Sequence, residues 1–361
     1  MKFTDKKTAV ILFNLGGPDR LSSVQNFLFN LFNDKAIISL PQPFRFFLAK
    51  LISKKRAKKA RKIYEQIGGR SPLLDITNSQ AHALELELSF FGNFKVFVVM
   101  RYFNPRARDV VEKVKDYDPN QIILLPLYPQ FSSATSDSSV KEFTEKLSIF
   151  ARRISKKIPI KTVCCYPAEP DFIRAHVLLI KQTISKFYDK NLEKFRFLFS
   201  AHGLPQKLID AGDPYVFHVT ETTNQIVKSL SESFEKIDFR ICYQSKVGPL
   251  KWTAPSLEHE IKRAVLDKKI PVILPVSFVS DHSETLVELD IQYKKLAMKF
   301  GAKNYLRVPA LNVDGHFIKA LSEICKAVSL NSDSQIFSGK KMHRICPKKF
   351  KLCPNFNGCG V

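Results

Sequence analysis

Eight short apolar runs, separated by longer segments with helical patterning, constrain the fold of this 361-residue chain more than any other feature. Four lie in the first half and four in the second: TAVILFNLG, FKVFVVMRY, QIILLPLYP, IKTVCCYP, RFLFSAHGLP, DFRICYQS, IPVILPVSFVS and YLRVPALN. Strands that are apolar on both faces and alternate with helices form parallel sheets covered on both sides. The sequence therefore predicts an α/β fold of two similar doubly wound, Rossmann-like domains with an interdomain cleft.

The two halves resemble each other, because IILLPLYPQFS and VILPVSFVSD both run an apolar strand through Leu-Pro into a polar loop. We predict an N-terminal α/β domain over residues 1–168, a C-terminal α/β domain over 169–330 and a basic, cysteine-containing tail over 331–361. Ligands of such folds bind where the carboxyl ends of strands face a cleft. The NLGGPDR turn after the first strand lacks both nucleotide-binding glycine patterns, so another kind of ligand is expected.

The formal net charge of +23 favours an anionic partner, which is nucleic acid, an anionic membrane surface or an acidic small molecule. Seven cysteines, an odd number, without a signal peptide before TAVILFNLG, indicate a reducing compartment. No apolar run reaches the roughly 18 residues that a membrane-spanning helix requires. We therefore expect a cytoplasmic protein, whose membrane association, if present, is peripheral on the inner face.

The segment PFRFFLAKLISKKRAKKARK combines an apolar helical face with dense positive charge. The residues spaced i, i+3, i+4, i+7 and i+8 on that face are Phe44, Phe47, Leu48, Leu51 and Ile52. A helix packed on the sheet with a solvated basic end is one interpretation. The other is an interfacial helix, whose apolar side touches lipid or a greasy ligand while its lysines meet anionic headgroups.

Residues 277–290, SFVSDHSETLVELD, place four carboxylates and one imidazole directly after an apolar run. Glu284 and Glu288 are four residues apart, so a helix starting there stacks both on one face, with Asp281 and His282 at its beginning. Acidic residues are also favoured in any first helical turn, so a capped, solvent-facing helix start is the alternative.

A second histidine, His202, ends the apolar run RFLFSAHGLP, and the predicted fold brings it near Glu284 from an adjacent strand tip. Two histidines and two glutamates at strand ends facing one cleft indicate a functional site. Imidazole and carboxylate without cysteine suit a loosely held divalent metal. We therefore expect the metal to be a substrate.

Together these stretches resemble the ferrochelatase family. The shared motifs run in order across residues 8–325: LFNLGGP, YEQIGGRSPL, MRYFNP, LPLYPQFS, SAHGLP, GDPY, CYQSKVGPLKW, SFVSDHSETLVELD and ALN. The resemblance implies the chelatase fold and a lyase that inserts Fe2+ into protoporphyrin IX, releasing two protons, in the last step of haem biosynthesis. It implies that His202 and Glu284 bind iron, accept a pyrrole proton, or both, with His282 and Glu288 supporting them.

The resemblance also implies residues that contact the porphyrin. Tyr215 in GDPY and Trp252 in VGPLKW would offer flat apolar surface to the macrocycle, core packing being the alternative. Arg101 and Tyr102 in MRY resemble residues near the porphyrin site, where a guanidinium can pair with a propionate. Residues 40–62 coincide with the apolar lip over the porphyrin mouth, and we call them the lip segment.

One position departs from the family pattern. Many relatives continue the acidic ridge with a third carboxylate after Glu288, where this chain has Gln292. A metal or proton relay through that position is therefore expected to be weakened.

The tail holds Cys346, Cys353 and Cys359, with six and then five residues between them. This spacing resembles bacterial ferrochelatases that hold a two-iron two-sulfur cluster with three C-terminal cysteines and one internal cysteine. The internal ligand would be Cys164 or Cys165, since four thiolates are the usual complement. The alternative is a basic, solvated tail with incidental thiols.

Two other functions stay open at this point. A chelatase for coproporphyrin, another tetrapyrrole or another metal would carry the same metal-site motifs, although the apolar lip segment favours the less charged protoporphyrin. A basic, non-enzymatic binder of nucleic acid or haem is the other, but the charge gathers in residues 50–62 and the tail, without a recognition motif. We therefore expect no nucleic-acid partner, and the sequence leaves the oligomeric state open.

Overall fold

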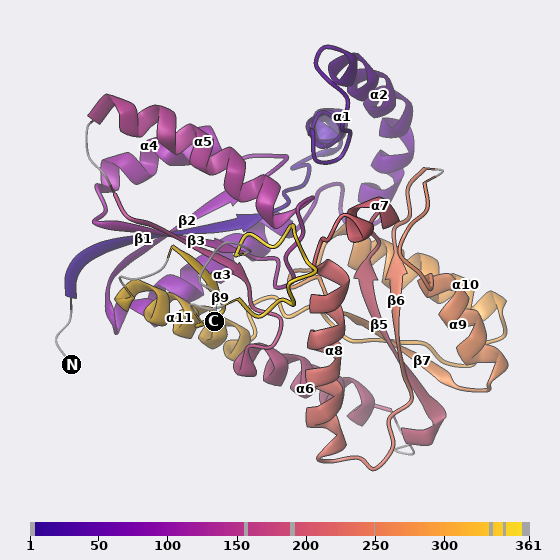
Figure 1. Cartoon of the computed structure of the whole chain (residues 1–361). Helices are drawn as coiled ribbons and strands as arrows, with labels where there is room; N and C mark the ends of the chain where they lie inside the picture. Colours follow the sequence, from indigo (N-terminus) through magenta and orange to yellow (C-terminus); the bar gives the residue numbers. More distant parts are fainter. Residues whose placement is uncertain are drawn as a thin grey trace. The chain divides into compact units, whose positions relative to one another are not determined.

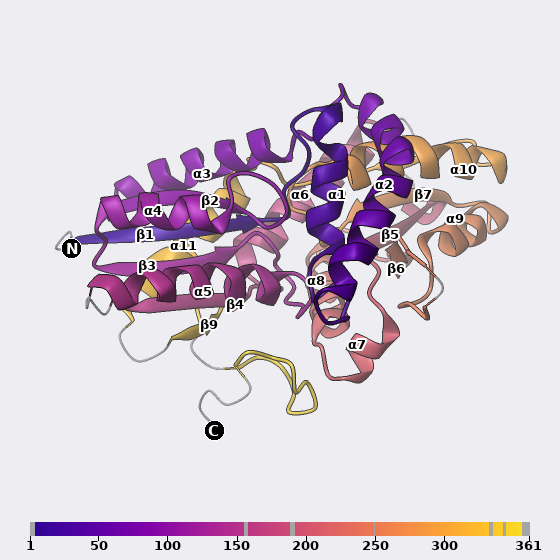
Figure 2. The same ribbon diagram turned by 90° about the horizontal axis from the view of Figure 1, so that it is seen from above.

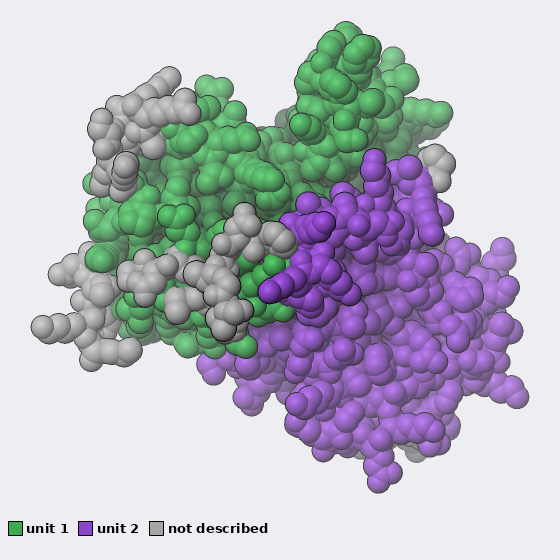
Figure 3. All heavy atoms as spheres, viewed as in Figure 1, with its two compact units in different colours: residues 1–165, 321–345, 354–361 green, residues 166–320, 346–353 purple. Residues whose placement is uncertain are grey.

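The computed structural model describes residues 4–154, 158–187, 192–248, 250–331, 335–341 and 344–355. The chain forms two compact units, shown in Figures 1 and 3. Unit 1 comprises residues 1–165, 321–345 and 354–361, and unit 2 comprises residues 166–320 and 346–353. The predicted domain boundary after residue 168 therefore lies three residues beyond the observed passage between units. Residues 321–345, which the sequence analysis divided between the second domain and the tail, belong to unit 1.

Unit 1 is built on a parallel five-stranded sheet with the order β2-β1-β3-β4-β9. Its strands are β1 (Thr4–Asn14), β2 (Gly92–Met100), β3 (Gln121–Pro126), β4 (Ile160–Cys165) and β9 (Ile336–Ser338). The short strand β9 pairs with β4, with Thr162 opposite Ile336, so the chain returns to this sheet after it has formed unit 2. Strand β9 was not among the eight predicted strands, because Ile336 and Phe337 are flanked by polar residues and form no apolar run.

Helices cover both faces of this sheet, as the doubly wound prediction requires (Figure 1). Helices α4 (Ala107–Tyr117) and α5 (Ser136–Ile154) pack on one face, where Ile11, Phe13 and Phe143 share a buried core. Helix α3 (Leu73–Ser89) and the C-terminal part of α11 (Gly315–Leu330) cover the other face. Burial on both sides explains why residues 9–13 of β1 are all apolar.

Two further helices of unit 1 form a separate pair. Helix α1 (Val24–Phe32), preceded by the short helix η1 (Leu21–Ser23), lies beside α2 (Phe44–Glu65), as Figure 2 shows. Ala49 of α2 packs in one buried cluster with Phe27, Leu28 and Phe32 of α1. The lip segment thus belongs to a helical hairpin.

Unit 2 repeats the architecture with a parallel four-stranded sheet in the order β6-β5-β7-β8. Its strands are β5 (Phe195–His202), β6 (Phe239–Gln244), β7 (Ile270–Pro275) and β8 (Leu306–Arg307). Its helices are α6 (Pro170–Ser185), η2 (Leu192–Lys194), α7 (Gln206–Asp210), α8 (Tyr215–Ser231), α9 (Leu257–Leu266), the π-helix η3 (Glu284–Tyr293) and α10 (Lys294–Lys299). In the described part of the chain, no helix combines the length and apolar character that crossing a bilayer demands.

Candidate active site

The candidate site of unit 2 lies at the carboxyl ends of three neighbouring strands. His202 is the last residue of β5 and pairs in register with Gln244, the last residue of β6. On the other side of β5, Ser200 pairs with Pro275, the last residue of β7, and the acidic segment begins two residues later. Parallel strands end at one edge of the sheet, so residues from three distant parts of the sequence meet there.

Gly203 makes this junction possible. A Cβ atom added at Gly203 would lie 3.1 Å from the carbonyl oxygen of Gln244 and 3.2 Å from Cε3 of Trp252. Both distances are tighter than most Cβ contacts, so a side chain at this position would require β6 or Trp252 to shift away from the end of β5.

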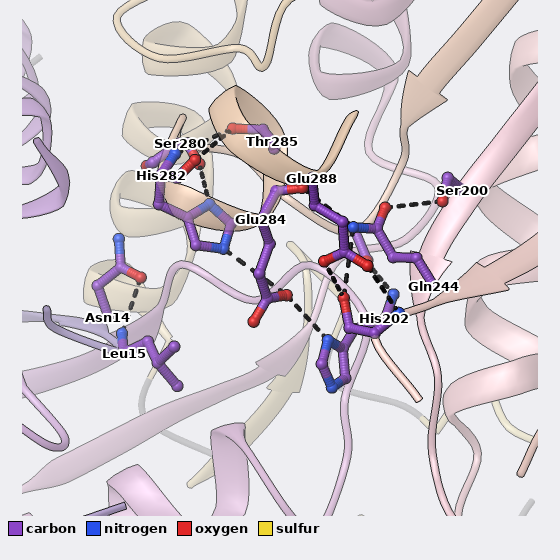
Figure 4. A network of polar contacts seen from close by, with 12 residues as sticks. Asn14, Leu15, Ser200, His202, Gln244, Ser280, His282, Glu284, Thr285 and Glu288 are labelled. Carbon is purple, nitrogen blue, oxygen red and sulfur yellow. Dashed lines mark hydrogen bonds and ion pairs between the residues drawn. The ribbon is translucent and has the colours of Figure 1, made fainter. Parts of the chain in front are cut away.

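The structure brings His202 and Glu284 together, as the strand-end argument predicted. Nδ1 of His202 lies 2.9 Å from Oε2 of Glu284 (Figure 4). The backbone N–H of His202 donates a hydrogen bond of 3.2 Å to the Ser277 hydroxyl, which fixes the end of β5 to the acidic segment. The two side chains keep 34% and 28% of their surface exposed, so a ligand can reach both.

His282 stands next to this pair. Its Nε2 lies 3.9 Å from Oε2 of Glu284, while its Nδ1 lies 3.1 Å from the Ser280 carbonyl oxygen (Figure 4). A carbonyl only accepts hydrogen bonds, so Nδ1 carries the proton and Nε2 faces Glu284. The backbone N–H of His282 donates to the Thr285 hydroxyl at 3.0 Å, which holds the turn before the helix.

Glu288, the second predicted glutamate, is held by Ser245. The N–H and hydroxyl of Ser245 donate to Oε1 and Oε2 of Glu288 at 3.1 and 2.6 Å. The neighbouring Gln244 donates through Nε2 to the backbone carbonyl of Glu284 at 3.1 Å and accepts from the Ser200 hydroxyl at 2.8 Å (Figure 4). Neither residue was predicted for the site, although Gln244 ends β6 and Ser245 follows it directly.

The two glutamates come from a π-helix and not from the ordinary helix that their spacing predicted. In a π-helix the backbone N–H bonds to the carbonyl five residues back, and such turns are rare and frequent at functional sites. The wider turn begins at Glu284 and ends at Tyr293, where α10 continues. Spacing alone cannot distinguish the two helix types.

Burial and charge act on the pKa values of this cluster in opposite directions. Burial disfavours the charged forms of His202 and Glu284, but their mutual contact outweighs it. The pKa of His202 is therefore raised, and that of Glu284 is lowered to about 2. Burial and the charge of Glu284 raise the pKa of Glu288.

Aromatic rings flank the imidazole of His202. The rings of Trp252 and Phe278 meet it edge to face, with centroids 6.5 and 6.4 Å away. Trp252 is half-buried, and within the described residues its buried indole N–H has no hydrogen-bond partner. Tyr215, at the start of α8, is buried, and burial raises its pKa. Phe278 was not predicted as a site residue, although it lies inside the acidic motif.

Arg101 and Tyr102 lie in unit 1, where they surround Asp34 instead of standing open to a ligand. Asp34 Oδ2 accepts from Arg101 Nη2 at 2.8 Å, from the Tyr102 hydroxyl at 2.7 Å and from the Ser138 hydroxyl at 2.8 Å. Arg101 also bonds Ser138 through Nε at 2.9 Å and pairs with Glu142 at 3.1 Å. Tyr102 is buried, so its direct contact with a porphyrin would require this network to open.

The apolar face predicted for the lip segment is divided in the structure. Phe44, Phe47 and Leu51 of α2 are 69%, 65% and 65% exposed, whereas Leu48 and Ile52 are half-buried. The side of α2 that packs on α1 carries small residues such as Ala49 instead.

The described cysteines are buried in both units. In unit 1 the Sγ atoms of Cys164 and Cys165 lie 3.5 Å apart. In unit 2 Cys353 is buried, and Cys346 Sγ lies 3.1 Å from Nε2 of the buried His218. Cys359 lies outside the described residues. Across the part of the chain that the structure describes, no three His, Cys, Asp or Glu side chains are arranged to hold a metal ion.

Comparisons with known proteins agree with this architecture. The ferrochelatase family model matches residues 7–328. The chain is 49% identical over 356 residues to the ferrochelatase of Rickettsia bellii (strain OSU 85-389), covering 98% of this chain and 96% of the relative. It is 48% identical over 355 residues to the ferrochelatase of Pelagibacter ubique (strain HTCC1062), covering 97% of this chain and 99% of the relative.

A solved structure supports the fold. SirB from Bacillus subtilis with Fe3+ matches with a TM-score of 0.52 at 14% identity, covering 91% of this chain and 97% of that chain. At this identity the likeness shows the fold alone, and the family assignment depends on the sequence matches. Because those matches span nearly the whole chain, this protein belongs to the ferrochelatase family, the lyases that insert Fe2+ into protoporphyrin IX in haem biosynthesis.

Proposed function

We propose that His202 and Glu284 carry the chelation reaction of this ferrochelatase, one as an iron ligand and the other as the acceptor of a pyrrole proton. The 2.9 Å contact between the two side chains, at a partly exposed strand end, is the observation that carries the proposal. For iron to enter the ring, Fe2+ must lose its bound water and two pyrrole N–H protons must leave. An imidazole and a carboxylate in contact can do both, since each binds a divalent cation and each accepts a proton.

The residues around the pair support this assignment by their chemistry. Glu288 adds a second carboxylate held by Ser245, and His282 adds a second imidazole beside Glu284. We infer that both support the pair by lowering the energy of a cation at the site. Protons leaving the pyrroles then have nearby acceptors with the correct chemistry.

We further propose that the rings beside His202 bind the porphyrin plane. Trp252 and Phe278 contact the imidazole edge to face and offer flat apolar surface next to the reacting pair. The indole N–H of Trp252 is buried and has no partner within the described residues, so we infer that the ring contributes its apolar face and not a hydrogen bond. Tyr215 is buried and would support the pocket from behind. Arg101 would reach a propionate only by sharing N–H groups that now bond Asp34, Ser138 and Glu142.

The test is an anaerobic assay of Fe2+ insertion, followed by the absorbance change of protoporphyrin IX, with coproporphyrin compared in parallel. His202→Ala and Glu284→Gln should each lower turnover by at least about 10²-fold, because each removes a proton acceptor or ligand. His259→Ala is the matched control, since His259 is an exposed histidine of α9 whose Nδ1 contacts Glu260 Oε1 at 3.1 Å, another imidazole–carboxylate contact in the same unit. Near-normal turnover of His202→Ala would refute the assignment.

The lip segment supports a second proposal, peripheral binding to an anionic membrane surface. Phe44, Phe47 and Leu51 expose apolar surface on α2, a helix that also carries exposed lysines. These lysines are Lys50, Lys54, Lys55, Lys58, Lys59 and Lys62. Apolar insertion combined with lysine attraction to anionic headgroups is the usual basis of interfacial helices.

A third proposal concerns the tail. We propose that Cys346, Cys353 and Cys359, with Cys164 or Cys165, hold a two-iron two-sulfur cluster. The described cysteines fit this group by chemistry, because they are buried and none is in a disulfide. A bound cluster would supply a covalent cross-link and not a step of the chelation.

A further inference from the structure

Arg307, in the short strand β8, joins the two ends of the segment that carries Glu284 and Glu288. We propose that Arg307 is a positioning residue for chelation, which fixes the segment from Asp281 to Asp290 and so keeps Glu284 in contact with His202. This inference depends on the proposed roles of His202 and Glu284. Arg307 lies outside the acidic motif of residues 277–290, but its contacts hold that motif in place.

Each of the three guanidinium nitrogens of Arg307 donates a hydrogen bond to an aspartate. Nη1 donates at 2.9 Å to Oδ1 of Asp281, a residue that precedes the π-helix. Nε and Nη2 donate at 2.7 and 2.6 Å to Oδ1 and Oδ2 of Asp290, a residue within the π-helix. The pair with Asp290 is bidentate, the strong and directional form of the arginine–carboxylate contact. With only 12% of the Arg307 side chain exposed, solvent competes weakly for these bonds.

Asn312 completes the anchor at Asp281. Its Nδ2 donates to Asp281 Oδ2 at 2.9 Å, and its Oδ1 accepts from the Asp281 backbone N–H at 2.9 Å. Asp281 is thereby held on both carboxylate oxygens and on its backbone. Only His282 and Ser283 separate it from Glu284, so the position of Asp281 sets where the π-helix begins.

A π-helix needs such an anchor because an α-helix is the more stable alternative for most sequences. If the segment rewound as an α-helix, each turn would hold fewer residues, and side chains after the first turn would point in new directions. Glu288, which follows Glu284 by four residues, would then leave Ser245, and Glu284 would keep its contact with His202 only while Asp281 holds the start of the helix. A single guanidinium that bonds both Asp281 and Asp290 resists this change, because rewinding alters the separation between the two carboxylates.

The same unit contains a matched control. Arg196, near the start of β5, also bonds two aspartates, Asp238 through Nε at 2.9 Å and Asp267 through Nη1 at 2.6 Å. It is 7% exposed and lies in the same strand as His202, but at the opposite end. Replacing Arg196 therefore removes equivalent bonds from the same unit without touching the acidic segment.

The experiment compares Arg307→Lys with Arg196→Lys in the full-length protein. Lysine keeps the charge but loses the planar fork, so both variants should lose similar thermal stability. Only Arg307→Lys should weaken the use of iron, with kcat/KM for Fe2+ falling by roughly 10–100-fold, as for other residues that orient metal ligands. The KM for protoporphyrin IX should stay unchanged in both variants. Direct anaerobic titration with Fe2+ should give weaker binding in Arg307→Lys alone.

A second pair keeps the test decisive if Arg307→Lys does not fold. Asp290→Asn weakens one half-exposed arm of the anchor, and Asp267→Asn weakens the equivalent arm at Arg196. Suppose that Arg307→Lys and Arg196→Lys, or Asp290→Asn and Asp267→Asn, have equal kcat/KM for Fe2+ while His202→Ala is inactive. That result would overturn the role of Arg307 and leave the proposed function unaffected. An active His202→Ala would instead overturn the proposed function itself.

Discussion

At the scale of single residues, the candidate site depends on the pair of His202 and Glu284, whose mutual contact favours their charged forms although both are partly buried. The contact between His202 and Glu284 raises the pKa of His202 and lowers that of Glu284 to about 2, although burial opposes both changes. The carboxylate therefore stays ionised across the physiological range, ready to attract a cation.

Another histidine of unit 2 shows the opposite behaviour and gives a prediction about pH. His176 in α6 is buried, and within the described residues neither ring nitrogen has a hydrogen-bond partner. Burial lowers its pKa to about 3. The unfolded chain binds a proton at an ordinary histidine pKa of about 6.5, so between these values the unfolded state holds more protons. The stability that depends on neutral His176 is complete above pH 6.5 and is lost as the pH falls towards 3.

Replacing His176 by leucine should remove this dependence. Between pH 7 and pH 5 the free energy of unfolding of the His176→Leu variant should gain about 2 kcal/mol relative to the unmodified protein, measured by urea unfolding. His82→Leu, at an exposed position of α3, is the control. If the unfolding free energies of His176→Leu and of the unmodified protein change equally between pH 7 and pH 5, His176 takes a proton in the folded state and the prediction is wrong.

Some residues of the candidate site carry a local signal in the sequence, and others do not, for a physical reason. His202 and Glu284 were found because each follows an apolar strand, which is a local signal. Arg307 and Ser245 were not found, because their contacts join positions 17 to 43 residues apart through side-chain geometry. Tyr102 carries a family resemblance, but its hydroxyl partner Asp34 lies 68 residues away, and only the structure reveals it.

At the scale of elements, the helical spacing of the lip segment predicted the right helix but not which apolar residues it exposes. Helix α2 presents Ala49 and other small residues to α1, and this close packing turns Phe44, Phe47 and Leu51 outward. Likewise, the spacing of Glu284 and Glu288 predicted a helix, whereas the π-helical turn depends on contacts outside it. Periodicity identifies an element, and the packing of that element decides what each face does.

The exposed face of α2 predicts salt-sensitive membrane binding. The protein should sediment with vesicles that contain anionic lipid at low salt and be released at high salt, because salt screens the attraction of lysines to headgroups. Phe47→Ser with Leu51→Ser should weaken sedimentation, since exposed apolar area is lost. Phe90→Ser is the matched control, because Phe90 is 75% exposed but lies at the end of α3, outside α2. Unchanged sedimentation of the double variant would show that the lip segment does not insert into lipid.

At the scale of the whole molecule, the chain passes between its two units several times. It leaves unit 1 after residue 165, returns at residue 321, and enters unit 2 again for residues 346–353. The repeated strand pattern predicted two α/β units, which the structure confirms, but these later passages have no signal in composition or periodicity. Each return is set by long-range packing, such as β9 pairing with β4.

These passages give the proposed cluster a consequence for the stability of the whole chain. Cys164 and Cys165 belong to unit 1, whereas Cys346 and Cys353 belong to unit 2. A cluster bound by Cys164 or Cys165 together with the tail cysteines would close a loop of well over a hundred residues, so its loss should lower the thermal stability. Protein purified without oxygen should then be reddish, with about two irons and two sulfides per chain.

Serine variants distinguish the internal candidates. Of Cys164→Ser and Cys165→Ser, the one that removes the true ligand should abolish the cluster absorbance and lower the melting temperature, while the other should keep both. Cys325→Ser is the matched control, because Cys325 is equally buried but lies in α11, and burial raises the pKa of its thiol. A thiol held protonated in this way is a poor metal ligand, so its replacement should leave the colour unchanged. Colourless protein after anaerobic purification, with a melting temperature that Cys346→Ser and Cys353→Ser do not change, would leave the tail without a metal.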